Sequence, residues 1–267
     1  SCVGSDGGKV WKVWEVWKVW KVWEVEMEAL KAMGVCCAYG KGAARVEVLK
    51  DFSLALQSGE FVALMGPSGS GKSTFLHLAA GLLLPTAGTI EVGGQDVTAM
   101  SDAAATKFRR RHEGVVFQAF NLLETLTVRE NIALPVRLDH RRPDAARVAE
   151  LVAKLGLAGK EARRPSELSG GEQQRVAIAR ALFAKPDVIL ADEPTGNLDA
   201  KASHAICGLL RELNRTERSA ILLVTHDPVV AAAATRVCFL KDGKVAADFA
   251  TEHDPAAISK RYLETYE

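Results

Sequence analysis

Four short apolar runs stand out along the chain, and each ends directly at a polar or glycine-rich element. They occupy residues 61–65, 115–117, 188–191 and 221–225. Continuous apolar runs of this length, separated by segments with helical periodicity, are typical of strands buried on both faces of a mostly parallel sheet. In such sheets ligands bind at the carboxyl ends of the strands. We therefore predict an α/β fold in which the four following elements converge on one site.

The first run leads into residues 66–74, which read GPSGSGKST. This matches the P-loop pattern G-x-x-x-x-G-K-[ST], placed after a predicted strand and before a helical pattern over residues 72–82. Glycines let main-chain N–H groups wrap a phosphate, Lys72 adds a mobile charge, and the Ser73 hydroxyl can ligate Mg²⁺. The candidate nucleotide-binding residues are Gly66, Pro67, Ser68, Gly69, Ser70, Gly71, Lys72, Ser73 and Thr74. The motif alone predicts nucleotide binding and leaves kinase, GTPase and ATPase open.

The other three runs end at Gln118, at Asp192-Glu193 and at His226. An acidic residue at the end of a buried strand is where a P-loop protein holds Mg²⁺, which points to Asp192. The adjacent Glu193 can act as general base on an attacking water. Each of these residues taken alone is equally compatible with a structural role. Their joint position at one edge of the predicted sheet favours a shared catalytic site.

Residues 168–182 read LSGGEQQRVAIARAL. Ser169, Gly170 and Gly171 stand at the start of a segment with an apolar stripe at Val176, Ala179 and Leu182. A Gly-Gly helix start with a hydroxyl is a second anion-binding helix terminus. The sequence thus predicts two phosphate-binding elements in one chain.

With these motifs, residues 34 to about 250 resemble the nucleotide-binding subunit of an ABC transporter. The resemblance makes LSGGE the family signature, in which Ser169, Gly170, Gly171 and Glu172 contact ATP. It makes Gln118 the Q-loop residue that contacts metal and water, and residues 196–199 (GNLD) the D-loop. It makes His226 the switch histidine beside the γ-phosphate, and Tyr39 the aromatic residue that stacks on adenine.

The resemblance also implies an architecture and an assembly. The fold is expected to be a P-loop NTPase with a RecA-like parallel sheet core, an antiparallel β subdomain near residues 34–57, and an inserted helical subdomain over about 119–180. Within the insert, residues 144–155 have the clearest helical pattern. The family pairs two nucleotide-binding subunits head to tail, so that two ATP molecules, each with Mg²⁺, lie between the P-loop of one and the signature of the other.

The class of ABC protein is narrowed by what the core contains. It has no heptad insert and no zinc spacing, unlike DNA-repair and chromosome members, and it has one core where translation members carry two. We expect an ATPase that docks through residues 120–135 on separate transmembrane permease chains, at the cytoplasmic face of the inner membrane. The motif wording resembles the lipoprotein-releasing, macrolide-exporter and cell-division group, and so implies export, lipoprotein extraction or mechanotransmission. An importer ATPase for a small solute and a soluble, partner-free ATPase are the alternatives.

Composition adds few constraints. Lys plus Arg number 34 and Asp plus Glu 33, so a net charge of +1 recruits neither nucleic acid nor anionic lipid. We expect no nucleic-acid partner. No apolar stretch approaches the roughly 18 residues that cross a bilayer. Five scattered cysteines without CxxC spacing favour buried thiols. The triplet 109–111 (RRR) is interpreted as a solvated helix end rather than as a phosphate or lipid patch.

All five tryptophans lie within residues 11–23, in a three-residue repeat of VWK and VWE. A period of three gives no consistent buried side on either a helix or a strand. We predict that residues 1–26 are a low-complexity extension outside the fold, upstream of a true start at Met27 or Met33, and that residues 27–267 form one nucleotide-binding domain. A membrane-surface or nucleic-acid-binding arm is the alternative, although Glu15 and Glu24 interrupt its positive charge.

Overall fold

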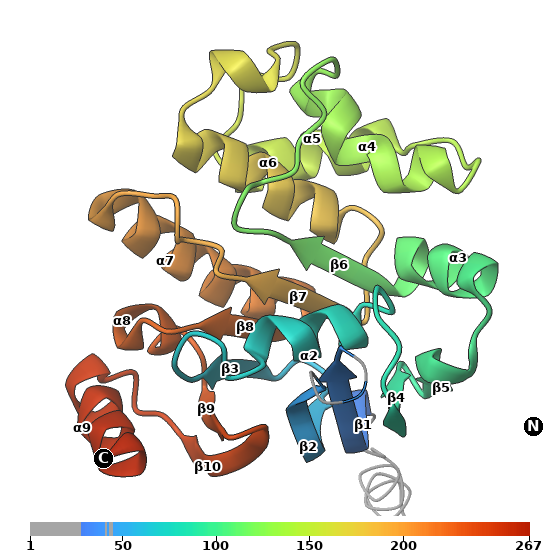
Figure 1. Cartoon of the computed structure of the whole chain (residues 1–267). Helices are drawn as coiled ribbons and strands as arrows, with labels where there is room; N and C mark the ends of the chain where they lie inside the picture. Colours follow the sequence, from blue (N-terminus) through green and yellow to red (C-terminus); the bar gives the residue numbers. More distant parts are fainter. Residues whose placement is uncertain (1–27, 41, 43–44) are drawn as a thin grey trace, which may run out of the picture.

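The computed structural model describes residues 28–40, 42 and 45–267, and the predicted extension 1–26 lies outside these residues. The described part contains a six-stranded sheet and a four-stranded sheet. Most of the helices lie above and beside the larger sheet in Figure 1, and the smaller sheet lies below it.

The larger sheet has the strand order β10-β9-β3-β8-β7-β6. Its strands are β3 (Phe61–Met65), β6 (Glu113–Val116), β7 (Val188–Asp192), β8 (Ala220–Thr225), β9 (Arg236–Lys241) and β10 (Lys244–Ala250). Pairing is parallel from β6 through β7, β8 and β3 to β9, and β10 pairs antiparallel with β9. The four apolar runs are therefore neighbouring strands of one mostly parallel sheet, as predicted, and their carboxyl ends lie along one edge.

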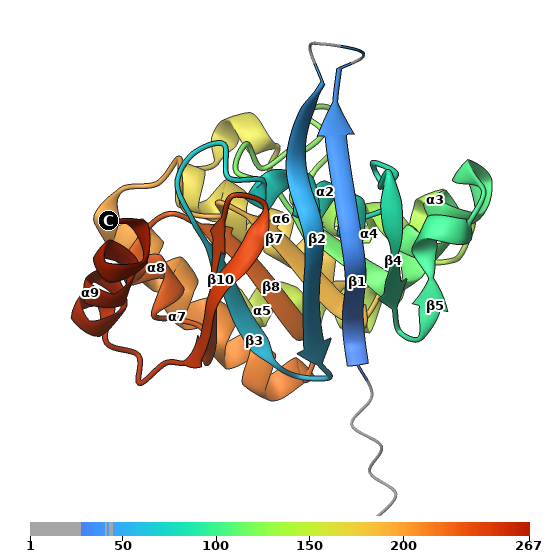
Figure 2. The ribbon, with the colours of Figure 1, turned by 60° about the horizontal axis from the view of Figure 1, so that its bottom comes forward.

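The smaller sheet is antiparallel and has the order β2-β1-β4-β5. Its strands are β1 (Glu28–Tyr39), β2 (Val46–Gln57), β4 (Ala87–Val92) and β5 (Gln95–Asp96). The sequence prediction of residues 34–57 was too narrow, because the sheet begins at Glu28 and takes two strands from beyond the P-loop. Gly88 permits the pairing of β4 with β1, since a Cβ there would lie 2.4 Å from the carbonyl oxygen of Gly34. Figure 2 shows this sheet from its outer side.

The α-helices of the described residues are α2 (Lys72–Ala79), α3 (Asp102–His112), α4 (Val128–Leu138), α5 (Ala145–Lys154), α6 (Gly170–Leu182), α7 (Ala200–Glu217), α8 (Pro228–Ala231) and α9 (Pro255–Tyr266), with the 3₁₀ helices η2 (Val97–Ala99) and η3 (Pro165–Glu167). α4, α5 and α6 follow β6 in sequence and lie together beyond that edge strand (Figure 1). The predicted helix at 144–155 is α5, with Asp144 as its N-cap residue.

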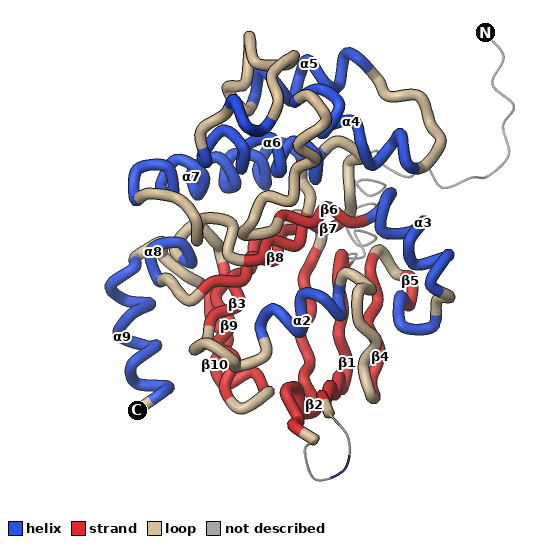
Figure 3. Tube along the Cα trace, turned by 45° about the horizontal axis from the view of Figure 1, so that its top comes forward, coloured by secondary structure: helices blue, strands red, loops and turns tan. Residues whose placement is uncertain are grey.

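Both faces of the parallel sheet are buried, which explains the continuous apolar runs. Phe61, Ala63 and Met65 of β3 belong to one hydrophobic cluster, together with residues of α4 to α9. Val62 and Leu64 belong to a second cluster, together with α2 and the antiparallel sheet. α2 lies between the two sheets (Figure 3). A side chain pointing to either face of β3 therefore enters a core.

α2 ends three residues before the predicted Leu82. Gly81 has a φ of 58°, in the left-handed region that glycine adopts readily, and it turns the chain out of the helix. The Arg109 guanidinium donates to the carbonyl oxygens of Ala80 (2.7 Å) and Gly81 (3.1 Å). Arg110 donates to Leu138 O, and Arg111 contacts Asp139. The arginine triplet lies in the last turn of α3 and is partly exposed, as a helix end is expected to be, and it also joins α3 to the ends of α2 and α4.

Candidate active site

The P-loop joins β3 to α2. Gly71 is the N-cap residue of α2 and has a φ of 106°, in the left-handed region that favours glycine. A Cβ on Gly66 would lie 2.6 Å from Leu240 O and 2.7 Å from Ser70 Oγ, so a side chain does not fit there. Pro67, Ser68 and Gly69 between them are exposed. The loop therefore presents its main chain at the start of a helix, where a phosphate binds favourably.

The ammonium group of Lys72 lies inside this loop. Its Nζ donates to Gly66 O (2.8 Å) and Pro67 O (2.9 Å), and the residue is only 7% exposed. Burial lowers the pKa of Lys72, while the nearby charges of Glu193 and Asp192 act to raise it. A positive charge held at this position would contact the phosphates of a nucleotide bound to the loop.

Ser73 and Asp192 meet although 119 residues separate them in the sequence. Ser73 Oγ donates to Asp192 Oδ1 over 3.0 Å. Burial raises the pKa of Asp192, and the hydrogen bond from Ser73 opposes that shift. A hydroxyl and a carboxylate oxygen are the kind of ligands that Mg²⁺ accepts, with phosphate and water supplying the rest. Within the described residues no group of three or more His, Cys, Asp or Glu could hold a metal by itself. The donor set fits a nucleotide-bound Mg²⁺.

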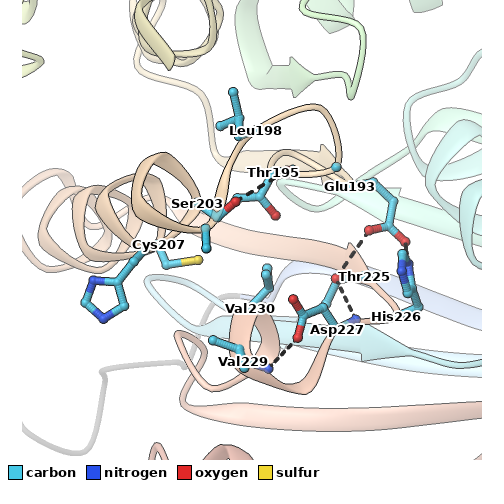
Figure 4. Close-up of a pocket in the computed structure, with 13 residues that line it drawn as sticks. Glu193, Thr195, Leu198, Ser203, Cys207, Thr225, His226, Asp227, Val229 and Val230 are labelled. Atoms are coloured by element: carbon cyan, nitrogen blue, oxygen red, sulfur yellow. Dashed lines mark hydrogen bonds and ion pairs between the residues drawn. The ribbon is translucent and has the colours of Figure 1, made fainter. Parts of the chain in front are cut away.

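Glu193 and His226 form the second close pair at this edge. Glu193 Oε1 lies 2.7 Å from His226 Nδ1, and Glu193 Oε2 accepts from the Thr225 hydroxyl at 3.3 Å (Figure 4). The side chain of Glu193 is 18% exposed and that of His226 is 67% exposed. Glu193 has a φ of 44°, which is uncommon for a residue with a side chain. Each carboxylate oxygen of Glu193, the predicted general base, thus has a side-chain partner: His226 for Oε1 and Thr225 for Oε2.

Thr225 is a site residue that the sequence analysis did not identify. It is fully buried at the end of β8, and its Oγ1 also accepts from the main-chain N–H of Asp227 at 3.1 Å. Its only signal in the sequence is its position between the apolar strand and His226. That position is also compatible with an ordinary strand end, so contact with Glu193 could not be inferred.

A cavity of about 580 Å³ opens beside Glu193 and His226 (Figure 4). Its lining comes from the carboxyl ends of β7 and β8, the D-loop, and the starts of α7 and α8: Glu193, Thr195, Gly196, Leu198, Ala200, Ser203, His204, Cys207, Thr225, His226, Asp227, Val229 and Val230. The contribution of α7 was not predicted, because its residues carry no recognisable spacing. The cavity leaves Glu193 and His226 accessible from the side of residues 196–199.

Gln118 lies at the same edge, but its side-chain amide contacts the D-loop. Nε2 donates to Asn197 Oδ1 (3.3 Å), and Asn197 Nδ2 donates to the main-chain oxygen of Gln118 (3.0 Å). Gly196 leaves room for this contact, since a Cβ there would lie 2.7 Å from Gln118 Nε2. The sequence predicted both segments without predicting that they pair.

Tyr39 lies at the end of β1, and 45% of it is exposed. Its hydroxyl lies 3.4 Å from Thr74 Oγ1 in the first turn of α2. The antiparallel sheet therefore brings an exposed aromatic ring next to the P-loop, where the base of a nucleotide would extend.

The signature lies apart from these residues. Ser169 is the N-cap residue of α6, and Gly170 lies close to Leu198 and Phe120. A separate cavity of about 410 Å³ is lined by Gly156, Ser169, Gly171, Glu172, Arg175, Asp199, Lys201, Ala202 and Ala205. None of these lining residues, all of which the structure describes, belongs to the P-loop. One chain thus carries the two predicted phosphate-binding elements at different places.

The Glu172 carboxylate has one partner at the start of its own helix and one outside that helix. It accepts from the main-chain N–H of Ser169 (2.9 Å) and contacts the ammonium group of Lys160. The hydrogen bond from Lys160 is the main reason why the pKa of Glu172 falls to about 2. These contacts stabilise the first turn of α6, and an acidic side chain is a poor ligand for a phosphate.

A search of the described residues for helices that are both long and apolar enough to span a bilayer finds none.

Comparisons with known proteins agree with this geometry. Residues 49–196 match the family model described as ABC transporter. The lipoprotein-releasing system ATP-binding protein LolD of Geobacter metallireducens is 45% identical over 221 residues, covering 82% of this chain and 98% of the relative. The bacitracin export ATP-binding protein BceA of Halalkalibacterium halodurans is 39% identical, covering 82% and 87%.

Among solved structures, the dimeric ATP-binding cassette MJ0796, in a post-hydrolysis state bound to ADP and Pi, matches with a TM-score of 0.75. It is 40% identical, and the match covers 83% of this chain and 98% of that one. The chain belongs to the ABC transporter family, as an ATPase subunit with the P-loop NTPase fold.

Proposed function

We propose that two copies of this chain close head to tail on two ATP molecules, and that closure drives a conformational change in separate membrane permease chains. The observation that carries the proposal is the separation of the two phosphate-binding elements within one chain. The P-loop, Asp192, Glu193 and His226 meet at one sheet edge, while Ser169 and Gly171 line a different cavity. A second copy can supply the missing element to each site. The dimeric state of MJ0796 supports this arrangement.

In each site we assign ATP binding to the P-loop main chain and Lys72, with Tyr39 stacking on adenine. The signature residues Ser169, Gly170 and Gly171 of the other copy would contact the γ-phosphate. Loss of that phosphate removes the contact between the copies, so ATP binding closes the dimer and hydrolysis reopens it.

Glu193 is the proposed general base. Its carboxylate would accept a proton from water as the water oxygen attacks the γ-phosphorus, and ADP would leave with the bridging oxygen. His226 and Thr225 hold the two carboxylate oxygens in place, so that the base does not have to reorient at the moment of attack. His226 would also contact the γ-phosphate.

Ser73 and Asp192 would hold Mg²⁺, with Gln118 as the third protein contact. When bound, the ion would offset the charge of the phosphate oxygens. In the structure the Gln118 amide turns to Asn197, so this role requires it to exchange that partner. We propose that this exchange lets Gln118 report nucleotide occupancy to the D-loop.

The proposed docking surface for a permease is the segment 120–135. Phe120 and Asn121 both have positive φ values, and the Arg180 guanidinium of α6 donates to the carbonyl oxygens of both residues. Leu123 is 46% exposed, and its main-chain N–H and O are held by the buried amide of Asn131. A rigidly held, exposed leucine suits an apolar partner segment. The relatives named for lipoprotein release and bacitracin export support a membrane partner of that group, with this chain peripheral at the cytoplasmic face.

The dimer and the base assignment are tested together with Glu193→Gln. We expect this variant to bind ATP with unchanged affinity, to lose hydrolysis, and to sediment as a dimer in ATP but as a monomer in ADP. Ser169→Glu should abolish the ATP-dependent dimer in the Glu193→Gln background, because it places a charge against the γ-phosphate. Wild-type turnover by Glu193→Gln would refute the base assignment, and a dimer that tolerates Ser169→Glu would refute the head-to-tail geometry.

Docking is tested by co-purification with candidate permease chains, which are recognised by their long apolar segments. Leu123→Asp should abolish capture while leaving the ATPase rate of the isolated subunit unchanged. Leu263→Asp is the matched control, because Leu263 is 57% exposed on α9, outside the segment 120–135. Equal capture by both variants would refute the docking surface.

A further inference from the structure

A buried amide on the signature helix contacts the loop that carries Glu193. Gln174, in the second turn of α6, is 0% exposed, and its Nε2 donates to Pro194 O over 2.6 Å. Its Oε1 is buried without a hydrogen-bond partner. An unpaired buried oxygen is unfavourable, so an apolar side chain of similar size would suit the core better. The Gln174 amide differs from a hydrophobic side chain in one respect that matters here, because it donates a hydrogen bond to Pro194 O.

Pro194 is the residue directly after Glu193, at the bend where β7 ends. The bend is unusual because Glu193 itself is left-handed, with a φ of 44°. Its other main-chain hydrogen bonds are Glu193 N–H to Val224 O (2.9 Å) and Gly196 N–H to Glu193 O (3.0 Å). The first of these bonds connects the bend to β8, and the second closes the bend on itself. The bond from Gln174 connects it to α6.

The same helix begins at the signature. Ser169 is the N-cap residue of α6, and Gln174 follows one and a half turns later, on a continuous helix that ends at Leu182. A helix is stiff over this length, so a displacement of its first turn moves Gln174 with it. The first turn faces one nucleotide of the proposed dimer, while Glu193 serves the other.

We propose that Gln174 is a positioning residue that holds the Glu193 bend in its catalytic conformation and ties it to the signature end of α6. The inference rests on the proposed function, in which Glu193 is the general base. It adds a direct connection, within one subunit, between the element that contacts one ATP and the base that hydrolyses the other.

Gln174→Met tests the proposal, because it removes the amide donor and keeps a side chain of similar volume. We expect kcat for ATP hydrolysis to fall about 10- to 100-fold, because a small displacement of a catalytic group has effects of that size. The affinity for ATP, measured by equilibrium titration, should stay within about twofold of wild type, since the variant leaves Lys72 and the P-loop untouched.

Ser219→Ala is the matched control. Ser219 is 7% exposed, and its hydroxyl donates to Pro186 O at 3.0 Å, just before the other end of β7. This variant also removes a buried side-chain hydrogen bond to a proline carbonyl, but far from Glu193. We expect it to lower the melting temperature and leave kcat at the wild-type value.

A double variant separates positioning from general loosening of the site. In a Glu193→Gln background the base is absent, so adding Gln174→Met should not lower the residual rate further. Were Gln174→Met to fail to fold, Gln174→Asn, which keeps a shorter amide, is measured instead, with the same split between kcat and affinity expected. Wild-type kcat in a folded Gln174 variant, or an equal fall in Ser219→Ala, would overturn the proposal. Wild-type hydrolysis by Glu193→Gln alone would instead overturn the proposed function on which it rests.

Discussion

Glu113 provides a prediction whose size follows from the structure. This carboxyl group lies at the start of β6 with 7% exposure, and its Oε2 has no hydrogen-bond partner. Burial raises the pKa of Glu113 to about 8, from an ordinary value of 4.5, although the nearby charge of Arg109 acts to lower it. The native protein therefore holds a proton on Glu113 at neutral pH that the unfolded chain has released.

The sign of the effect on stability follows. Between about pH 4.5 and about pH 8 the native state binds more protons at this site than the unfolded state, so this contribution falls as the pH rises. The contribution of Glu113 to the free energy of unfolding is fully present below about pH 4.5 and is lost above about pH 8. A shift of this size corresponds to a loss on the order of 5 kcal/mol across the window, of which about 3 kcal/mol is reached at pH 7.

Glu113→Gln removes the titration while keeping the shape of the side chain. We expect the difference in unfolding free energy, variant minus wild type, to rise from pH 5 through pH 7 to pH 8.5 and then level off. Urea unfolding followed by circular dichroism measures it at each pH. Glu47→Gln, at a carboxyl group whose side chain is 56% exposed, serves as the control for replacing a glutamate that is not buried. If the Glu113→Gln difference is flat, the carboxyl group is not buried as described.

Four further predictions concern nucleotide binding and the amino terminus. Lys72→Ala should weaken ATP binding about 10- to 100-fold in an equilibrium titration, because it removes a charged donor, while unchanged affinity would exclude Lys72 from the site. Tyr39→Ala should weaken binding about 5- to 100-fold through lost stacking, whereas Tyr39→Phe should bind like wild type; equal losses in both would count against stacking. Deleting residues 1–26 should preserve ATPase activity and solubility. Deleting residues 1–32 should lower stability by about 2–5 kcal/mol or more, because it also removes the buried Leu30 of β1; equal melting temperatures would contradict this.

The last contrast separates the two candidate start sites. Met33 lies within β1, five residues after its first residue, and Ala29, Leu30 and Ala32 before it are buried. A chain beginning at Met33 would lack part of the strand that pairs with both β2 and β4. The complete sheet therefore requires residues that precede Met33.

Prediction from the sequence was most accurate where a local pattern reflects its surroundings directly. A strand buried on both faces is apolar at successive positions, so residues 61–65 could be identified as a strand before any pairing was known. Glycine at a left-handed helix start is likewise a local requirement, as at Gly71. The antiparallel sheet was recognised only in part, because neither β4 (AGTIEV) nor β5 (QD) has a continuous apolar run and both depend on pairing with other strands.

Side-chain contacts within the site were beyond the sequence for a related reason. Gln118 with Asn197, Thr225 with Glu193, and Gln174 with Pro194 each join segments that adjoin only after the sheet forms. Glutamine and threonine are common enough at strand ends and in helices that their type carries no information about such a partner. Only residues belonging to a recognisable motif could be named in advance.

The amino-acid sequence alone determined that this chain binds a nucleotide at the end of a parallel sheet and belongs with the ABC ATPases. P-loop geometry and burial on both faces of a strand require particular residue types at fixed local spacings. Those spacings can be recognised in the sequence itself. Tertiary structure decided which carboxylate oxygen meets which donor, that the signature lies apart from the P-loop in one chain, and that α6 reaches the Glu193 bend. Those facts depend on distances between segments up to 119 residues apart, and such distances are set by packing rather than by local pattern.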